Sequence, residues 1–168
     1  GEELWSHLDQ GGLVASADWP QPLQPAPNYE RQRALVRGTR EDVREIVEVA
    51  GITDPGTITI TVTPDWKYRA YEAAQEASSP EELFATAETE GWVTDGGDDA
   101  RRAYLADLAD RLTELQPVLA PAEEHQLLRQ AAWLIEEEFD AEVRVSRADG
   151  TTPTDARPNR PAIDITAT

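Results

Sequence analysis

The sequence predicts an α+β fold, with a small sheet of about three strands, packed helices and a short N-terminal helical remnant. Residues 57–63 read Thr-Ile-Thr-Ile-Thr-Val-Thr, an unbroken alternation that is typical of a strand with one buried face. Longer segments at 29–50, 98–115 and 121–138 place apolar residues at helical spacing instead. Short alternating runs at 141–146 and 162–166 would complete the sheet.

The N-terminal part divides into two pieces. Residues 1–20 begin as helix interior without a capping residue, and Gly11-Gly12 would stop that helix. We expect these residues to be poorly packed by themselves. Four prolines between 20 and 27 predict a stiff linker over residues 21–28. The chain contains no Met and starts at Gly1, so we expect a piece of a longer protein whose remaining domain is 29–168.

The first long helix has recognisable ends. Asn28 is placed to cap its start, and Gly51 is a good C-terminal stop. Gly38 lies inside the helix and would allow a kink, after which Thr39 could cap a second helix. We therefore expect helix over 29–50, with a break at Gly38 as an open alternative.

The strand at 57–63 leads directly into helical segments. Thr63-Pro64-Asp65 has the pattern of a cap, a proline at the first helical position and an acid in the first turn. This predicts a helix to about residue 77, and Ser79-Pro80 would begin another short one. Gly96-Gly97 marks a break before the helix at 98–115.

The last third predicts a helix followed by two strands. Pro117 and Pro121 separate the helix at 98–115 from that at 121–138. Val143 and Val145 should point inward from strand 141–146, and Ile163 and Ile165 from strand 162–166. The intervening residues 148–158 read as a loop.

The net charge of −18 is the strongest compositional signal, with 33 acidic and 15 basic residues. Lys67 is the only lysine. High net charge can indicate disorder, but the periodic segments argue against that for most of the chain. A halophilic origin fits better, because the Debye length falls to about 3 Å at 1 M salt and the carboxylates then hardly repel one another.

The sequence offers no catalytic, metal or cofactor site. There is no cysteine, and His7 and His125 have no spaced partner. A glycine-rich phosphate loop and a nucleophile elbow are both missing. No apolar run is long enough for a membrane span, and no signal peptide is visible. We predict a cytoplasmic protein that works by binding and has neither a membrane nor DNA as a partner.

Two stretches are locally basic against this acidic background. Residues 28–44 carry five arginines and three acids, and residues 144–160 carry four arginines and two acids. Lys67-Tyr68-Arg69 adds a small cluster. Arginine forks suit phosphates and base edges. The alternative for 28–44 is ordinary pairing within one helix, for example between Arg40, Arg44 and the neighbouring Glu41 and Glu45.

Four segments, in order along the chain, resemble the C-terminal end of leucyl-tRNA synthetases of the archaeal and eukaryotic-cytosolic type. They are Glu-Glu-Leu-Trp to Asp-Trp-Pro at 2–20, Glu-Asp-Val-Arg-Glu-Ile at 41–46, the strand and Pro-Asp-Trp-Lys-Tyr at 58–68, and 139–165. The last contains Ala-Arg-Pro and Arg-Pro-Ala-Ile-Asp-Ile. Where this family tends to use lysine, the chain has arginine or acids, which fits a halophilic form.

The resemblance implies a role for the chain. Residues 1–20 would close the anticodon-binding helical domain, and 29–168 would be the C-terminal domain that reaches the long variable arm of leucine tRNA. The parent enzyme would attach leucine with ATP and Mg, and its catalytic motifs are absent here. The implied partners are leucine tRNA and the remainder of the synthetase. The implied tRNA-binding residues are Arg157, Arg160, Ile163, Asp164, Lys67 and Arg69.

A structural or protein–protein docking domain without direct RNA contact is the alternative. The positions of the arginines separate the two hypotheses. Arginines gathered on one open face near the tail favour RNA, whereas arginines dispersed among carboxylates favour docking.

Overall fold

The computed structural model describes residues 28–93, 99–151 and 154–167 and confirms an α+β fold. The predicted remnant at 1–20 and the linker up to residue 27 lie outside the described residues. The elements are α2 (Tyr29–Ala50), β1 (Pro55–Val62), α3 (Asp65–Glu76), α4 (Pro80–Thr89), α5 (Asp99–Ala109), α6 (Pro121–Phe139), β2 (Glu142–Arg147) and β3 (Ala162–Ala167).

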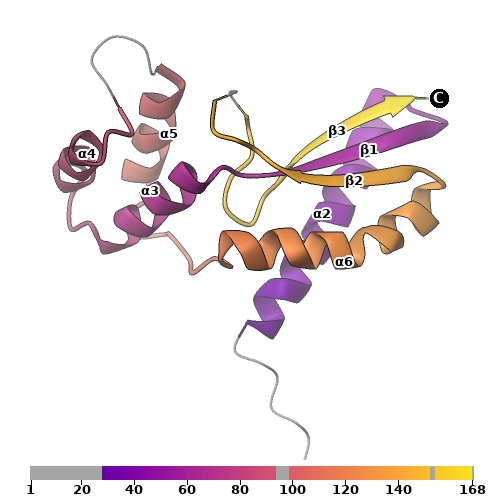
Figure 1. Ribbon diagram of the computed structural model, residues 1–168, viewed down its shortest axis with the longest axis horizontal. Helices are drawn as coiled ribbons and strands as arrows, with labels where there is room; N and C mark the ends of the chain where they lie inside the picture. The colour runs from indigo at the N-terminus through magenta and orange to yellow at the C-terminus, as the bar shows by residue number, and fades with distance from the viewer. Residues whose placement is uncertain (1–27, 94–98, 152–153, 168) are drawn as a thin grey trace, which may run out of the picture.

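The described strands form one mixed sheet in the order β2-β1-β3 (Figure 1). Strand β1 runs parallel to β2 and antiparallel to β3, so Ile58 lies between Val143 and Ile165. Side chains alternate between faces along a strand, and paired residues share a face. One face is therefore apolar in all three strands, with Ile58, Ile60, Val62, Val143, Val145, Ile163 and Ile165.

Helices α2 and α6 pack with this sheet and close the first core. Its fully buried members come from every layer: Leu35 and Val43 from α2, Ile60 from β1, and Leu128 and Ile135 from α6. Asn28 and Gln32 reach Glu123 at the start of α6. Arg40 and Arg44, further along α2, reach Glu138 near the end of α6, so the two helices run in the same general direction.

Helices α3, α4 and α5 form a separate lobe at one end of the molecule (Figure 1). A second core holds it together, with small residues such as Ala70 and Ala74 in α3 against Leu83, Leu105 and Leu108. This lobe is inserted between β1 and α6. Side chains in the segments that connect the two cores can therefore contact residues of both.

The expected helix over 29–50 is confirmed as α2, whereas the alternative of a break at Gly38 and the expected cap bond of Asn28 are wrong. The helix is continuous through Gly38, and Thr39 is buried in its interior, because an unbroken helix places Leu35, Thr39 and Val43 on one face. Asn28 occupies the N-cap position but makes no side-chain cap bond. Its amide donates to Glu123 instead, while its oxygen accepts from Arg31.

Two other boundaries also differ from prediction. Pro64 is the N-cap of α3, and the Thr63 hydroxyl is buried without a hydrogen-bond partner, because β1 carries Thr63 into the core. Helix α5 ends at Ala109 rather than near 115. The Arg111 and Glu114 amides donate to carbonyls three residues earlier, a tighter turn than the α-helix.

Candidate functional site

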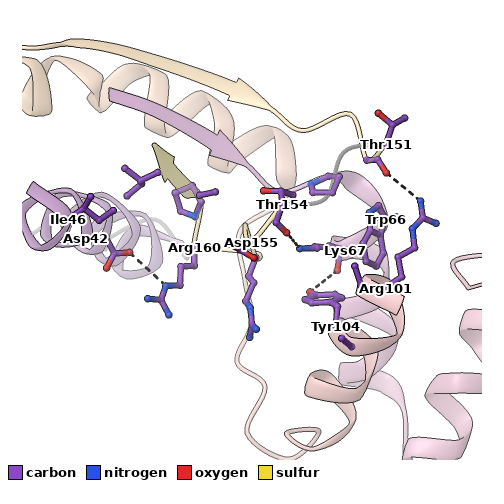
Figure 2. A pocket seen from close by; sticks show the side chains of 18 of the residues that line it. Asp42, Ile46, Trp66, Lys67, Arg101, Tyr104, Thr151, Thr154, Asp155 and Arg160 are labelled. Carbon is purple, nitrogen blue, oxygen red and sulfur yellow. Dashed lines mark hydrogen bonds and ion pairs between the residues drawn. The ribbon is translucent and has the colours of Figure 1, made fainter. Parts of the chain in front are cut away.

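A groove of about 1440 Å³ lies between the C-terminal half of α2 and the N-terminal half of α5 (Figure 2). The start of α3 and the segment leading into β3 complete its lining. Its walls combine apolar and aromatic side chains with charged ones. The residues used below are Asp42, Ile46, Val49, Trp66, Lys67, Arg101, Tyr104, Asp155, Arg157, Arg160, Pro161 and Ile163.

The groove is locally cationic on an acidic protein. Four cationic side chains line it, against the three carboxylates of Asp42, Glu45 and Asp155. This contrasts with −18 for the chain as a whole. The groove is therefore a place where an anionic ligand meets less repulsion than elsewhere on the chain.

Two of the four cations are presented by a tight turn, Arg157-Pro158-Asn159-Arg160, which we call the arginine turn. The amides of Arg157 and Arg160 each donate to the other residue's carbonyl, at 2.8 Å in both directions. Asn159 has φ 60°. Proline followed by a left-handed asparagine is the sequence that a type II turn prefers. Both guanidinium groups thus start from a fixed backbone.

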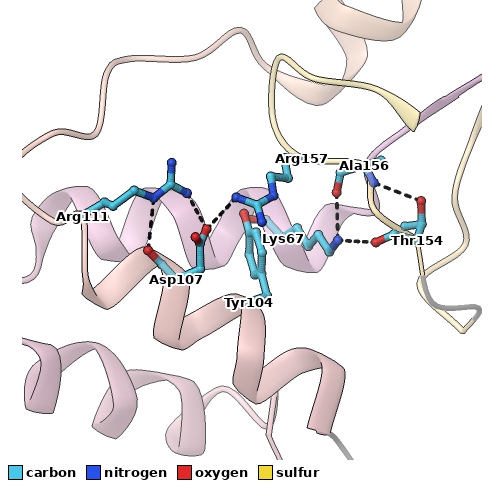
Figure 3. A network of polar contacts seen from close by, with 7 residues as sticks. All are labelled: Lys67, Tyr104, Asp107, Arg111, Thr154, Ala156 and Arg157. Carbon is cyan, nitrogen blue, oxygen red and sulfur yellow. Dashed lines mark hydrogen bonds and ion pairs between the residues drawn. The ribbon is translucent and has the colours of Figure 1, made fainter. Parts of the chain in front are cut away.

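The buried side chain of Lys67 supports the segment that leads into the arginine turn (Figure 3). Only 7% of the residue is exposed, and its amino group donates to the carbonyls of Thr154 at 2.6 Å and Ala156 at 2.8 Å. It also lies 4.9 Å from the ring centre of Tyr104. Burial lowers the pKa of Lys67, and Arg157 lowers it further.

Glu124 anchors the centre of the arginine turn. Its carboxylate is fully buried, accepts from the Tyr68 hydroxyl and accepts from the Asn159 amide at 2.8 Å. Burial raises the pKa of Glu124, and the two hydrogen bonds offset that only in part. In turn, the Leu119 amide donates to the Asn159 side chain at 3.1 Å.

The two turn arginines differ in their freedom. Arg157 donates to Asp107 at 2.6 Å, and Asp107 also accepts from Arg111 at 2.5 Å (Figure 3). The Arg160 side chain is 75% exposed and lies 3.8 Å from Asp42 across the groove (Figure 2). Arg160 is the cation that can most readily turn to a ligand.

The structure brings four of the six predicted residues together. Arg157, Arg160, Lys67 and the half-buried Ile163 all line the groove. Arg69 is exposed on α3 and lines a separate small pocket. Asp164 pairs with Thr59 and points to the polar face of the sheet. Contact with tRNA stays a prediction for all six, and the buried amino group of Lys67 suits support of the loop better than direct contact.

Several arginines outside the groove are engaged with carboxylates. Arg40 and Arg44 both donate to Glu138 of α6, rather than to their neighbours in α2. Opposing contributions act on Glu138: desolvation raises its pKa, but the hydrogen bonds from Arg44 and Arg40 outweigh this and hold it below the usual value. Further ion pairs join Arg37 to Glu41, Arg144 to Glu142 and Arg147 to Asp65.

Sequence reasoning missed several lining residues. Trp66 and Tyr104 read as ordinary core aromatics, and Arg101 lies next to an acidic run. In the structure Arg101 lies 5.0 Å from the ring centre of Trp66 and donates to the Trp92 carbonyl at 3.1 Å. Glu124 has the appearance of a solvated first-turn glutamate, so no local signal could have identified it.

Within the described residues, no group of three or more potential ligands could hold a metal ion. No helix there is long and apolar enough to cross a membrane.

No family model matches the chain. Several archaeal proteins are similar along almost its entire length. The chain is 36% identical to a leucine–tRNA ligase of Halobacterium salinarum over 167 residues, which is 98% of the chain and 18% of that ligase. The leucine–tRNA ligase of Aeropyrum pernix is 33% identical over 96% of the chain, and that of Pyrococcus abyssi 27% over 98%. The chain spans 17% of each of these two relatives.

Proposed function

The chain is homologous to the C-terminal region of archaeal leucine–tRNA ligases, and we propose that it is the tRNA-binding module of such an enzyme. It would hold leucine tRNA by the long variable arm while the rest of the synthetase, using ATP and Mg, attaches leucine. The groove between α2 and α5 would be the surface that contacts RNA. We expect the module to work in the cytoplasm and to have no catalytic site of its own.

The observation that carries this proposal is the extent of the similarity. It covers 98% of the chain in the Halobacterium salinarum ligase, and matches to ligases of other archaea span the same range. The groove adds a physical argument, because Arg157, Arg160 and Ile163, three of the residues that the family resemblance implies for tRNA binding, line one surface.

The composition of the groove suits an unpaired RNA segment better than a helix. Sequence-specific RNA binding usually targets loop bases that are splayed out against apolar or aromatic side chains. The half-buried Ile163 and Trp66 offer such surfaces, and the exposed Arg160 guanidinium offers a fork for a base edge or phosphate. The tip of a variable arm has the right chemistry.

High salt makes this combination necessary. Phosphate contacts lose affinity steeply as salt rises, because binding no longer gains from counterion release. A protein working in molar KCl must therefore rely on base edges, stacking and apolar contacts. The mixed lining of the groove supplies these in addition to its cations.

A binding comparison in molar KCl tests the proposal. The 168-residue chain is titrated with intact leucine tRNA and with the same tRNA whose variable arm has been shortened to the closing base pairs. We expect tighter binding of the intact tRNA. Equal affinity for both RNAs would reject recognition of the arm by this module.

Docking on the rest of the synthetase without RNA contact is the second candidate. Trp133 on α6 is 61% exposed and Val49 on α2 is 81% exposed, and apolar side chains of this size are common in protein interfaces. This candidate predicts that Trp133→Ala weakens association with the remainder of the enzyme and leaves tRNA preference unchanged. If Arg160→Ala weakened the tRNA preference and left association with the remainder of the enzyme unchanged, the RNA-binding role would be favoured.

A further inference from the structure

Glu124 is a buried carboxylate that the proposed function does not require. It lies near the start of α6 and is fully buried between α3 and the arginine turn. One of its two oxygens, Oε1, has no hydrogen-bond partner. Burying a carboxyl group is costly, and one with an unsatisfied oxygen costs more. A leucine at this position would avoid both costs.

The contacts of Glu124 show what an apolar residue could not do. Its Oε2 atom accepts the Asn159 amide at 2.8 Å, and Asn159 is the residue of the turn with positive φ. The acceptor of that amide is a carboxylate that is itself fully buried. Because the Tyr68 hydroxyl donates to the same oxygen, the acceptor itself is held in place from α3.

Neither turn arginine touches Glu124. Arg157 reaches Asp107 on α5, and Arg160 extends toward Asp42 on α2. In the described part of the chain, hydrogen bonds connect Glu124 to the two arginines through the turn backbone at Asn159. We therefore expect Glu124 to affect a ligand in the groove through the position of the arginines.

We propose that Glu124 is the positioning residue of the arginine turn, and that it fixes Arg157 and Arg160 at the groove through its hydrogen bond to Asn159. This inference rests on the proposed function where it concerns RNA, but the turn itself can be observed without RNA. Buried polar groups are retained in some proteins because they select one conformation at a cost in stability. Glu124 fits that description, since it accepts a donor that no apolar residue could satisfy.

Three variants separate positioning from stability. Glu124→Gln keeps an acceptor at this position without the charge. Glu124→Leu keeps the volume and removes the acceptor. Leu128→Ala, one helical turn further along α6 in the first core, is the control, because Leu128 is buried and its side chain has no polar atom to bond the turn. Should Glu124→Leu not fold, Glu124→Asp shortens the side chain by one methylene and provides the milder comparison.

The first measurement is amide hydrogen exchange of the RNA-free chain in molar KCl. Exchange of the Asn159 amide is compared with that of Ile60 in β1, which reports global opening. We expect Glu124→Leu to accelerate amide exchange at Asn159 by about tenfold or more relative to exchange at Ile60. In Glu124→Gln and Leu128→Ala, the ratio of the two exchange rates should stay near that of the unaltered chain. An unchanged ratio in Glu124→Leu would overturn the proposal whatever the RNA result.

The second measurement is affinity for intact leucine tRNA at the same salt. We expect Glu124→Leu to bind about tenfold more weakly and Glu124→Gln to bind within about twofold of the unaltered chain. If exchange at Asn159 were faster in Glu124→Leu but its affinity for intact leucine tRNA were unchanged, the positioning role in binding would be overturned. If the unaltered chain showed no preference for the intact arm, the proposed function would fail, while the exchange data would still decide whether Glu124 fixes the turn.

Discussion

Residues 28–44 and 144–160 have the same local excess of arginine over acids, yet they reach different environments. In α2, Arg40 and Arg44 converge on one carboxylate, Glu138, and tie two helices together at the surface. In the later stretch, the arginine turn is held through its backbone, and the Arg160 side chain projects with 75% exposure. The region in α2 uses Arg40 and Arg44 to join two helices, whereas the later region presents one of its arginines, Arg160, at the groove.

The difference shows that a local charge count does not identify a binding surface. The partner of Arg44 lies 94 residues away, so a window around α2 cannot include it. Conversely, the groove is cationic because Lys67, Arg101 and the turn come from three separate elements. Whether an arginine is available depends on which carboxylates the fold brings to it.

The largest effect that would test this comparison is expected from Lys67, which supports the segment leading into the arginine turn. Lys67→Met removes two hydrogen bonds from a buried ammonium group to the Thr154 and Ala156 carbonyls. We expect the free energy of unfolding to fall by about 3 kcal/mol, because bonds to charged groups are strong and the carbonyls remain partly buried. Denaturant titration in molar KCl measures it.

Arg69→Met is the matched control for Lys67→Met, because Arg69 is an exposed cation two residues later on α3. We expect its effect to stay within about 0.5 kcal/mol. Similar losses of unfolding free energy for the two variants would mean that Lys67 does not support the segment leading into the turn. The contrast with α2 would then weaken.

The next effect compares the two regions directly. Removing both turn arginines, as Arg157→Ala with Arg160→Ala, should weaken binding of intact leucine tRNA by about tenfold or more, or about 1.4 kcal/mol. Removing Arg40 and Arg44 takes away the same charge from α2. We expect that pair to change affinity by no more than about twofold, because Glu138 already occupies these guanidinium groups. Equal losses would mean that charge alone, rather than its presentation, determines binding.

The sequence carries most of the fold and part of the site. The alternation at 57–63 predicts β1 because the core residues and the strand signal are the same residues, and Ser79-Pro80 predicts the start of α4, whose cap accepts from Glu82. Boundaries fail where tertiary contacts compete with a local motif. Thr63 has the pattern of a cap, but the strand that precedes it carries it into the core.

Without the family resemblance, site residues could be predicted only where a basic residue stands out against an acidic chain. Arg157 and Arg160 do so, since they flank a proline with few acids nearby. Glu124 cannot be separated by sequence from the other acidic residues, because its burial results from Tyr68 and Asn159 meeting it in space. Trp66 similarly belongs to the second core and to the groove at once.

A third effect appears as a pH dependence. Burial raises the pKa of Glu124 above its ordinary value of 4.5 in the folded protein, so the folded state holds this proton more tightly than the unfolded state does. As pH rises from about 4.5 toward the raised value, ionisation in the unfolded state draws the equilibrium toward unfolding, and Glu124 costs stability. The groups facing it are the Tyr68 hydroxyl and the Asn159 amide.

Glu124→Gln should remove this contribution. We expect the chain to lose stability relative to Glu124→Gln as pH rises through that window, measured by denaturation in molar KCl at several pH values. Glu137→Gln, an exposed position on the same helix, separates burial from the loss of one negative charge. Parallel curves for Glu124→Gln and the unaltered chain would show that the carboxyl group is solvated, and the account of the turn's anchor would need revision.

The smallest effect belongs to α2. A double-mutant cycle with Arg44→Ala and Glu138→Ala should give a coupling free energy of about 1 kcal/mol or less, because both side chains remain in contact with solvent. The coupling should fall further as KCl is raised over the range in which the chain stays folded, since the Debye length shrinks to about 3 Å at 1 M. The loss caused by Lys67→Met should hardly respond to the same change, because its bonds are shielded from salt by the protein. If the coupling between Arg44 and Glu138 persisted undiminished in molar KCl, the ion pairs of α2 would be as insensitive to salt as the bonds that support the turn. The contrast between the two regions would then rest on the exposure of Arg160 alone.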